Sequence, residues 1–194
     1  MKCPDADLLE RFVNSFHRFG ELLAYEQVPP ELDGGLDDSR WARQKWRPAA
    51  IATDPAALAP LYRKLPGRFP PLYESLALSY RWLEVELGDT VRLLSNPPGP
   101  ALQGLLEYIT VDRVFVKVLL PLGLIPFGRG CGGSYDPICF DIKHRNAAGD
   151  CPVVRVEHEA VLCDLRLGKT WQVAASFRDL VGTVVGEADD WFSR

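Results

Sequence analysis

Residues 125–141 read IPFGRGCGGSYDPICFD, and residues 153–159 read VVRVEHE. The first stretch is a short apolar run, a glycine-rich loop and a second apolar run. The other stretch is a third apolar run that ends in charged residues. Short apolar runs bounded by glycine and proline are typical of buried β-strands. These residues therefore predict three strands, with the glycine-rich loop between the first two.

Working outward, the same pattern predicts strands at residues 124–127, 137–142, 152–159, 161–167 and 170–174. Gly168 and Lys169 form a two-residue hairpin signal between the last two. A further hairpin is expected at residues 84–94, with its turn at Gly88 and Asp89. Alternation along the strands predicts one buried face that holds Ile138, Phe140, Val154 and Val156.

Helical periodicity dominates the rest of the chain. It predicts helices at residues 7–25, 55–65, 72–83, 102–109 and 111–122. Residues 37–46 have acids first and bases last, as a helix dipole favours, so a helix is expected there too. Ser176 and Asp179 are spaced as a capping box that opens a last helix. Helices, then hairpin-linked strands, then a helix predict an α+β fold with a mostly antiparallel sheet flanked by helices.

Composition limits the classes of function. The chain has 194 residues, 47% of them hydrophobic, and a formal net charge of -4. We expect one α+β domain at residues 56–194, with residues 1–55 as an N-terminal helical extension packed on it.

The net charge of the chain gives no basic field that would attract nucleic acid. The start of the chain lacks a signal-peptide apolar region, and charges and prolines interrupt the apolar stretch 111–127, so a cytoplasmic protein with no membrane span is expected.

The five cysteines are odd in number and lack C-x-x-C spacing. This pattern argues against a zinc ribbon and against a secreted disulfide framework. Cys139 and Cys163 lie in apolar strand patterns, where a thiol acts as a small hydrophobic group. We therefore expect five reduced thiols, with Cys139 and Cys163 buried, and no metal or cofactor.

Three features could carry chemistry. The glycine-rich loop at residues 128–133 precedes a strand and has no lysine after it, so it does not fit a phosphate-binding loop. His158 lacks a second histidine at helical spacing, and on a strand it would point away from Glu157 and Glu159. Asp136, Asp141 and Asp150 lie near turns, where a carboxylate accepts backbone N–H bonds. A small hydrolase that uses Asp141, Glu157 and His158 is the catalytic alternative.

Several of these segments resemble the signature of the SUKH superfamily, the Smi/Knr-type domain. The matching segments are residues 126–128, 133–141 and 153–159, together with Ser176 and Phe177, and the resemblance covers residues 60–185. Members of that superfamily are mostly binding proteins, and many are bacterial immunity proteins that neutralise toxins. The resemblance implies a structural role for the motif residues: Gly128 for a backbone turn, Phe140 for packing, and Asp141 and His158 as part of the scaffold.

The resemblance also implies a protein-binding surface on the sheet and its loops. We expect Arg129 and Tyr135 as anchors, because arginine and tyrosine are enriched in interfaces. Asp136, Glu157 and Glu159 would steer a basic partner toward them. The expected function is a non-enzymatic immunity protein against a toxin such as a nuclease. A regulatory scaffold without a toxin partner and a small metal-dependent hydrolase are the alternatives.

Overall fold

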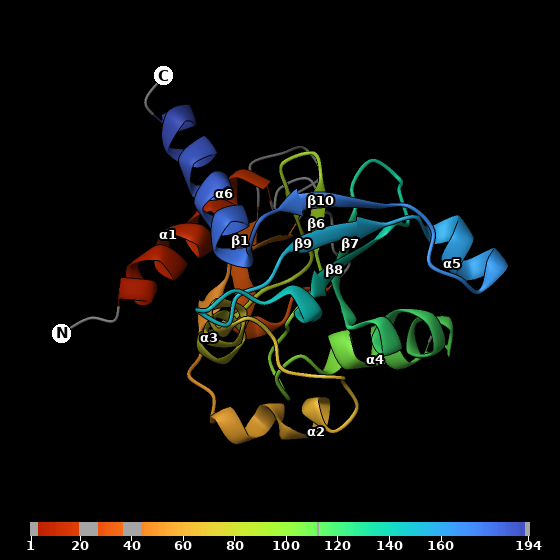
Figure 1. Ribbon diagram of the computed structural model, residues 1–194. Coiled ribbons are helices and arrows are strands. Elements are labelled where there is room, and N and C mark those ends of the chain that lie inside the picture. Colours follow the sequence, from red (N-terminus) through yellow and green to blue (C-terminus); the bar gives the residue numbers. More distant parts are fainter. Residues whose placement is uncertain (1–3, 20–26, 37–43, 112, 193–194) are drawn as a thin grey trace.

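The computed structural model describes residues 4–19, 27–36, 44–111 and 113–192. Its centre is an antiparallel sheet of six strands with the order β10-β9-β8-β7-β6-β5 (Figure 1). The strands are β5 (Val85–Leu87), β6 (Val91–Leu93), β7 (Leu124–Gly130), β8 (Pro137–Asp141), β9 (Val153–Val156) and β10 (Thr170–Ala174). The predicted α+β class with an antiparallel sheet is confirmed.

Several α-helices surround the sheet in the described part of the chain. They are α1 (Pro4–Phe19), α2 (Ala59–Tyr62), α3 (Pro71–Ser79), α4 (Gln103–Val111), α5 (His158–Asp164) and α6 (Phe177–Phe192). After α4 the chain forms a π-helical turn at Phe115–Leu119 and a 3-10 turn at Leu120–Leu122, which contains Pro121. Further 3-10 turns lie at Pro30–Leu32, Pro55–Leu58 and Ile142–His144. None of the helices in the described part of the chain has the length and apolar character needed to cross a bilayer.

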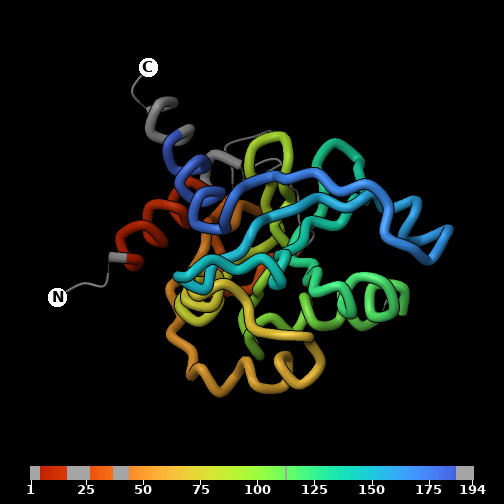
Figure 2. Tube along the Cα trace, viewed as in Figure 1, coloured from red at the N-terminus to blue at the C-terminus, as the bar shows by residue number. Residues whose placement is uncertain are grey.

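The first and last helices lie side by side, although they come from distant parts of the chain (Figure 2). The rings of Phe12 in α1 and Phe177 in α6 meet edge to face at 6.4 Å. Phe12, Phe16 and Phe177 are all buried on the same side of the sheet. The apolar stripe expected for the first helix therefore exists, and it faces the end of the chain. The predicted residues 20–25 of that helix lie outside the described residues.

The start of α6 is held by two side chains. Ser176 Oγ accepts the backbone N–H of Asp179 at 3.0 Å, which is the N-cap bond of the predicted capping box. The buried carboxylate of Asp150 accepts the N–H groups of Phe177 and Arg178 at 3.1 and 3.0 Å. These acceptors satisfy backbone donors that have no partner inside the helix.

The sheet is buried on both faces. One face packs on α1, α3 and α6 and holds the main core, to which Phe127, Phe140 and Val153 belong. The opposite face carries a smaller core with Cys139 and Val156, covered by Phe115 of the π-helical turn and by Val161 of α5. The apolar runs were continuous rather than alternating because both faces are covered.

The predicted single buried face is wrong. In the observed register Phe140 pairs with Val153, and Cys139 pairs with Val154. Paired residues point to the same face, so Phe140 shares its face with Val153 and not with Val154. Ile138 and Phe140 therefore face the main core, whereas Val154 and Val156 face the smaller one.

Three other local predictions differ from the structure. Residues 161–167 are not a strand, because His158–Asp164 is α5, which interrupts the connection between β9 and β10. Residues 44–46 of the predicted helix 37–46 are strand β2 (Gln44–Trp46), paired with β1 (Asp33–Leu36), and residues 37–43 lie outside the described part. The β5–β6 hairpin has a connection of residues 88–90 instead of two residues, since Leu87 pairs with Val91.

Residues 1–55 are not a purely helical extension. Besides β1 and β2 they contain β3 (Ala49–Ala50), which pairs with β4 (Tyr80–Arg81). Phe12, Leu32 and Trp46 belong to the same buried cluster as the centre of the sheet. This segment thus contributes directly to the main core.

A buried arginine closes the end of α3. Arg81 is 2% exposed, and its Nη1 donates to the carbonyl oxygens of Ala77 and Tyr80 at 2.7 and 2.8 Å. Its Nη2 donates to Thr53 Oγ1. The side-chain amide of Asn96 donates to the same two carbonyls at 3.1 and 3.0 Å. Among the described residues no carboxylate pairs with Arg81, so its positive charge is balanced by carbonyls at the negative end of a helix.

Candidate partner-binding surface

Asp136, just before β8, binds two residues of neighbouring elements at one end of the sheet. It is 6% exposed. One carboxylate oxygen accepts the Nε–H of Arg155 at 2.7 Å. The other accepts the backbone N–H of His158 at 3.0 Å and lies 2.6 Å from His158 Nδ1. Because His158 is the first residue of α5, Asp136 ties that helix to the start of β8.

The charge state of Asp136 follows from these contacts. Burial alone would raise the pKa of the carboxyl group, but the bonds from His158 and Arg155 outweigh it and hold the pKa below its ordinary value. Asp136 therefore remains a carboxylate down to acidic pH. It can keep Arg155 and His158 in fixed positions over that range.

Four side chains around Asp136 form what we call the aromatic–arginine patch: Tyr135, Arg155, His158 and Trp171. The ring centroids of Tyr135 and His158 are 6.0 Å apart, and the Arg155 guanidinium lies 5.0 Å from the ring centroid of Trp171. Tyr135 and Trp171 are 66% and 42% exposed. Exposed aromatic side chains beside a fixed arginine are typical of the residues that dominate protein interfaces.

We expect Asp136→Asn to lower the free energy of unfolding at pH 7 by about 2 kcal/mol, because the variant loses charge-assisted hydrogen bonds. The pKa of Asp136 is lowered by folding, so its contribution is complete above the unfolded value of about 3.9. It is lost as the pH falls through the lower folded value. Urea denaturation of both proteins between pH 7 and pH 2 measures this difference. Asp164→Asn, in an exposed ion pair with Arg166, is the matched control. A stability difference that does not change with pH would contradict the prediction.

The structure brings only some of the predicted binding residues together. Tyr135 and Asp136 lie in or beneath the patch, and Glu159 is exposed on the first turn of α5. Glu157 is half-buried, and its carboxylate accepts the backbone N–H of Lys169 at 3.2 Å. Glu157 thus holds the segment that returns from α5 to β10.

Arg129 is separated from the patch. In β7, Arg129 pairs with Arg92 of β6, and the preceding residue, Gly128, pairs with Ile138 of β8. Consecutive residues of a strand point to opposite faces of the sheet. Arg129 therefore points to the face of the sheet opposite Arg155, the cross-strand neighbour of Ile138. Its Nη2 donates to Glu84 Oε2 at 2.7 Å, so the predicted outward anchor is a half-buried ion-pair residue.

Gly128 and His158 have different local roles from those expected. Gly128 lies within β7 at a bulge, and a Cβ there would be 2.8 Å from the carbonyl oxygen of Arg92. Glycine is needed for this close approach of two strands, not for a turn. His158 begins a helix, so the predicted strand orientation, away from Glu157 and Glu159, does not apply.

The three residues of the hydrolase alternative have separate partners. Asp141 lies 2.7 Å from His144 Nδ1 and accepts the backbone N–H of Lys143, while His158 is bound to Asp136 and Glu157 to Lys169. Within the described residues, no group of three or more His, Cys, Asp and Glu side chains is arranged to hold a metal ion.

The cysteines divide into buried and accessible thiols. Cys131, Cys139, Cys151 and Cys163 are free, and Cys3 lies outside the described residues. Cys139 is buried as predicted, and burial raises the pKa of its thiol far above the ordinary value. The prediction for Cys163 is wrong, because this residue is exposed near the end of α5.

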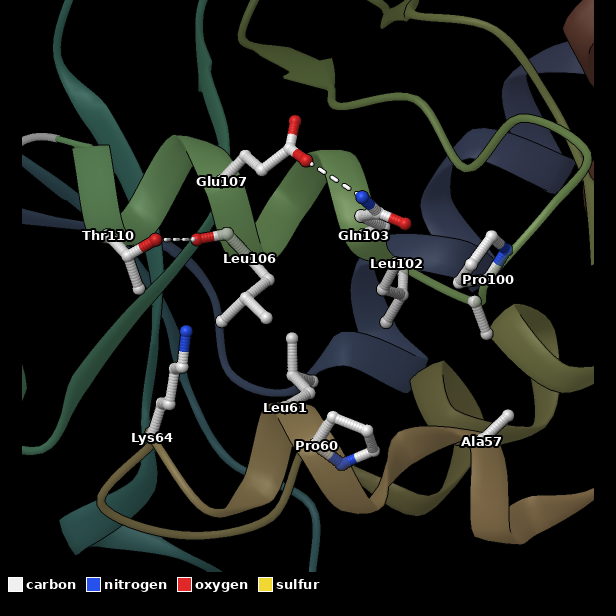
Figure 3. A pocket seen from close by; sticks show the side chains of 11 residues that line it. Ala57, Pro60, Leu61, Lys64, Pro100, Leu102, Gln103, Leu106, Glu107 and Thr110 are labelled. Atoms are coloured by element: carbon white, nitrogen blue, oxygen red, sulfur yellow. Dashed lines mark hydrogen bonds between the residues drawn. The ribbon is translucent and has the colours of Figure 1, made fainter.

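A separate pocket of about 410 Å³ lies between α2 and α4 (Figure 3). Its walls are mainly apolar, with Leu61, Leu102 and Leu106 among them. Glu107 accepts a bond from Gln103 at 2.9 Å, and Thr110 donates to the Leu106 carbonyl at 2.8 Å. The polar side chains that α4 contributes are therefore engaged within that helix, whereas Lys64 lines the pocket from the segment after α2. The pocket shares no residue with the aromatic–arginine patch.

In comparisons with known proteins, no family model matches the chain, and no curated protein matches it significantly. The assignment of the candidate site therefore depends only on the contacts within this chain. Arg155 and Trp171 are the two patch residues that sequence reasoning missed. The signal for Arg155 was a charge inside an otherwise apolar strand, VVRV.

Proposed function

We propose that this chain is a non-enzymatic binding protein of the SUKH type, and that it acts in the cytoplasm as an immunity protein against a toxin such as a nuclease. The observation that supports this proposal is the aromatic–arginine patch. Tyr135 and Trp171 are exposed, while the buried Asp136 fixes Arg155 and His158 between them. Rigid aromatic and arginine side chains lose little conformational freedom on binding, which favours affinity.

Charge supports a basic partner. The chain has a formal net charge of -4, and Glu159 is exposed on α5 next to the patch. A nuclease that binds nucleic acid phosphates presents basic groups, and opposite charges at the rim of an interface accelerate association. Glu159→Lys should therefore slow association, and more so at low salt.

The decisive variant is Tyr135→Ala, tested against the product of the gene directly upstream, which the proposed function expects to be a toxin. We expect binding to weaken by about 2 kcal/mol or more, about thirtyfold in Kd, because an exposed aromatic anchor is removed. The thermal midpoint should hardly change, since Tyr135 is 66% exposed. Calorimetric titration and thermal melts of the same protein measure both.

Val111→Ala is the matched control, since Val111 is 80% exposed and lies in α4. It should leave the affinity unchanged. A lower melting temperature for Tyr135→Ala with unchanged affinity would remove Tyr135 from the binding site. The absence of any complex between the unmodified chain and that toxin would contradict the proposed function itself.

A further inference from the structure

Strand β10 is an edge of the six-stranded sheet and has one strand neighbour, β9, among the described residues (Figure 1). Thr170, Trp171 and Gln172 are all exposed. An exposed strand edge offers backbone donors and acceptors to another strand, and proteins usually protect it with proline, inward-pointing charges or a covering element. Thr170–Ala174 contains no proline and no charged residue.

The register identifies which backbone groups face outward. The backbone N–H of Glu157 donates to the Lys169 carbonyl at 2.9 Å, so this pair is hydrogen-bonded across β9 and β10. Hydrogen-bonded and non-bonded pairs alternate along an antiparallel ladder. The backbone groups of Trp171 therefore face Arg155 in β9. The backbone N–H and C=O groups of Thr170 and Gln172 point away from β9, toward the open edge.

We propose that the chain forms a twofold dimer in which β10 pairs antiparallel with β10 of a second copy, with Trp171 opposite its own counterpart. In this register Thr170 of each copy faces Gln172 of the other, so all four outward residues exchange backbone hydrogen bonds. Trp171 then occupies the non-bonded position on the axis, where side chains of facing strands approach most closely.

The sequence is self-complementary in this register. Thr170 and Gln172 are uncharged, and Lys169 faces the bulge at residues 172–174 instead of another lysine. No like charges oppose each other, and the largest exposed side chain of the strand, Trp171, contacts its own copy. These features favour a second copy of this chain over a strand of another protein.

Apolar residues next to the edge extend the same surface. Leu162, Leu165 and Leu167 are 41%, 60% and 38% exposed, and they lie in α5 and in the segment that leads into β10. Leu165 has a φ of +54°, a left-handed conformation that disfavours a leucine and that glycine commonly adopts after a helix. In the antiparallel dimer this segment lies beside the end of β10 in the other copy, around the exposed Ala175.

The dimer does not require the proposed function. It covers Trp171, one of the four patch residues, and leaves Tyr135 and His158 available to a partner. Tyr135 precedes β8, two strands inside the edge, so each copy would keep its own Tyr135 and His158 beside the twofold axis. Tyr135→Ala should not change the mass of the dimer. The two proposals can therefore fail independently.

The test uses Trp171→Lys and Trp171→Glu, each alone and in an equimolar mixture. The unmodified chain should have about twice its chain mass of 21.7 kDa by light scattering at micromolar concentration. Its far-ultraviolet circular dichroism should contain the couplet of two stacked indoles. Each variant alone should be monomeric, because two like charges would meet on the axis. The mixture should form a dimer again, because lysine then faces glutamate.

A second pair of variants tests the backbone contacts. Gln172→Pro removes an outward N–H and should weaken dimerisation at least tenfold, whereas Gln172→Ala keeps that donor and should remain dimeric. Thermal melts check that both proteins are folded. A monomer at every concentration of the unmodified chain would overturn the inference. A dimer that survives in both single Trp171 variants would overturn the proposed register.

Discussion

Phe140→Ala is expected to lower the free energy of unfolding by about 4 kcal/mol, because it removes a ring from the centre of the main core. Phe140 is fully buried and stacks on Phe127, with ring centroids 3.9 Å apart and an interplanar angle of 7°. The rings of Tyr73 and Phe177 meet it edge to face at 5.0 and 5.6 Å. Alanine would leave a cavity among rigid rings that belong to β7, α3 and α6, so little collapse can fill it.

Urea denaturation of Phe140→Ala, Phe140→Leu and the unmodified chain measures this effect. The leucine variant should lose much less, about 1 to 2 kcal/mol, because it keeps most of the buried volume. Tyr135→Ala serves as the exposed aromatic control and should lose less than about 1 kcal/mol. Equal losses for Phe140→Ala and Tyr135→Ala would show that the aromatic cluster is not the centre of the fold.

Arg81→Ala is expected to lower the free energy of unfolding by about 4 kcal/mol, for an electrostatic reason. Burial lowers the pKa of this guanidinium, yet arginine remains charged at all accessible pH values. Its removal would leave Thr53 and the last carbonyls of α3 with fewer donors in a dry environment. Unpaired buried polar groups carry the full cost of their lost hydration.

Two variants separate charge from volume at this position. Arg81→Met keeps the apolar stem and removes the charge, so it should lose about half as much, since Asn96 still donates to both carbonyls. Arg63→Ala removes an exposed arginine next to α2 and should change stability by less than about 0.5 kcal/mol. If Arg81→Met were more stable than the unmodified chain, the hydration cost of the buried charge would exceed the benefit of its bonds.

The sequence predicted those elements whose signals are local. The strands around residues 124–127, 137–142 and 170–174 and the N-cap at Ser176 depend on runs and spacings within a few residues, and they were correct. Helix α5 was missed because Val161, Cys163 and Leu165 alternate as a strand would. The first residue of the helix, His158, is bound by Asp136 from 22 residues away in the chain, a contact with no local signal.

The candidate site shows the same limit. Tyr135 and Asp136 could be chosen from an exposed loop next to an apolar strand. Trp171 joins them only because β10 pairs with β9 across the α5 connection, and that pairing has no local signal. Arg129 was expected in an outward loop, but β7 continues through Gly130, so Arg129 lies within the strand and pairs with Glu84.

The contact between α1 and α6 has a consequence for how the chain folds. Asp5 and Arg178, which form an ion pair at 2.6 Å, are 173 residues apart in the sequence. The apolar side of α1 therefore emerges from the ribosome long before the helix that covers it. Contacts of such large separation are slow to form, because nearly the whole chain must be closed into a loop first. Until α6 is made, Phe12 and Phe16 remain available to chaperones or to other nascent chains, so the yield of folded protein should depend on translation and chaperone supply more than its final stability does.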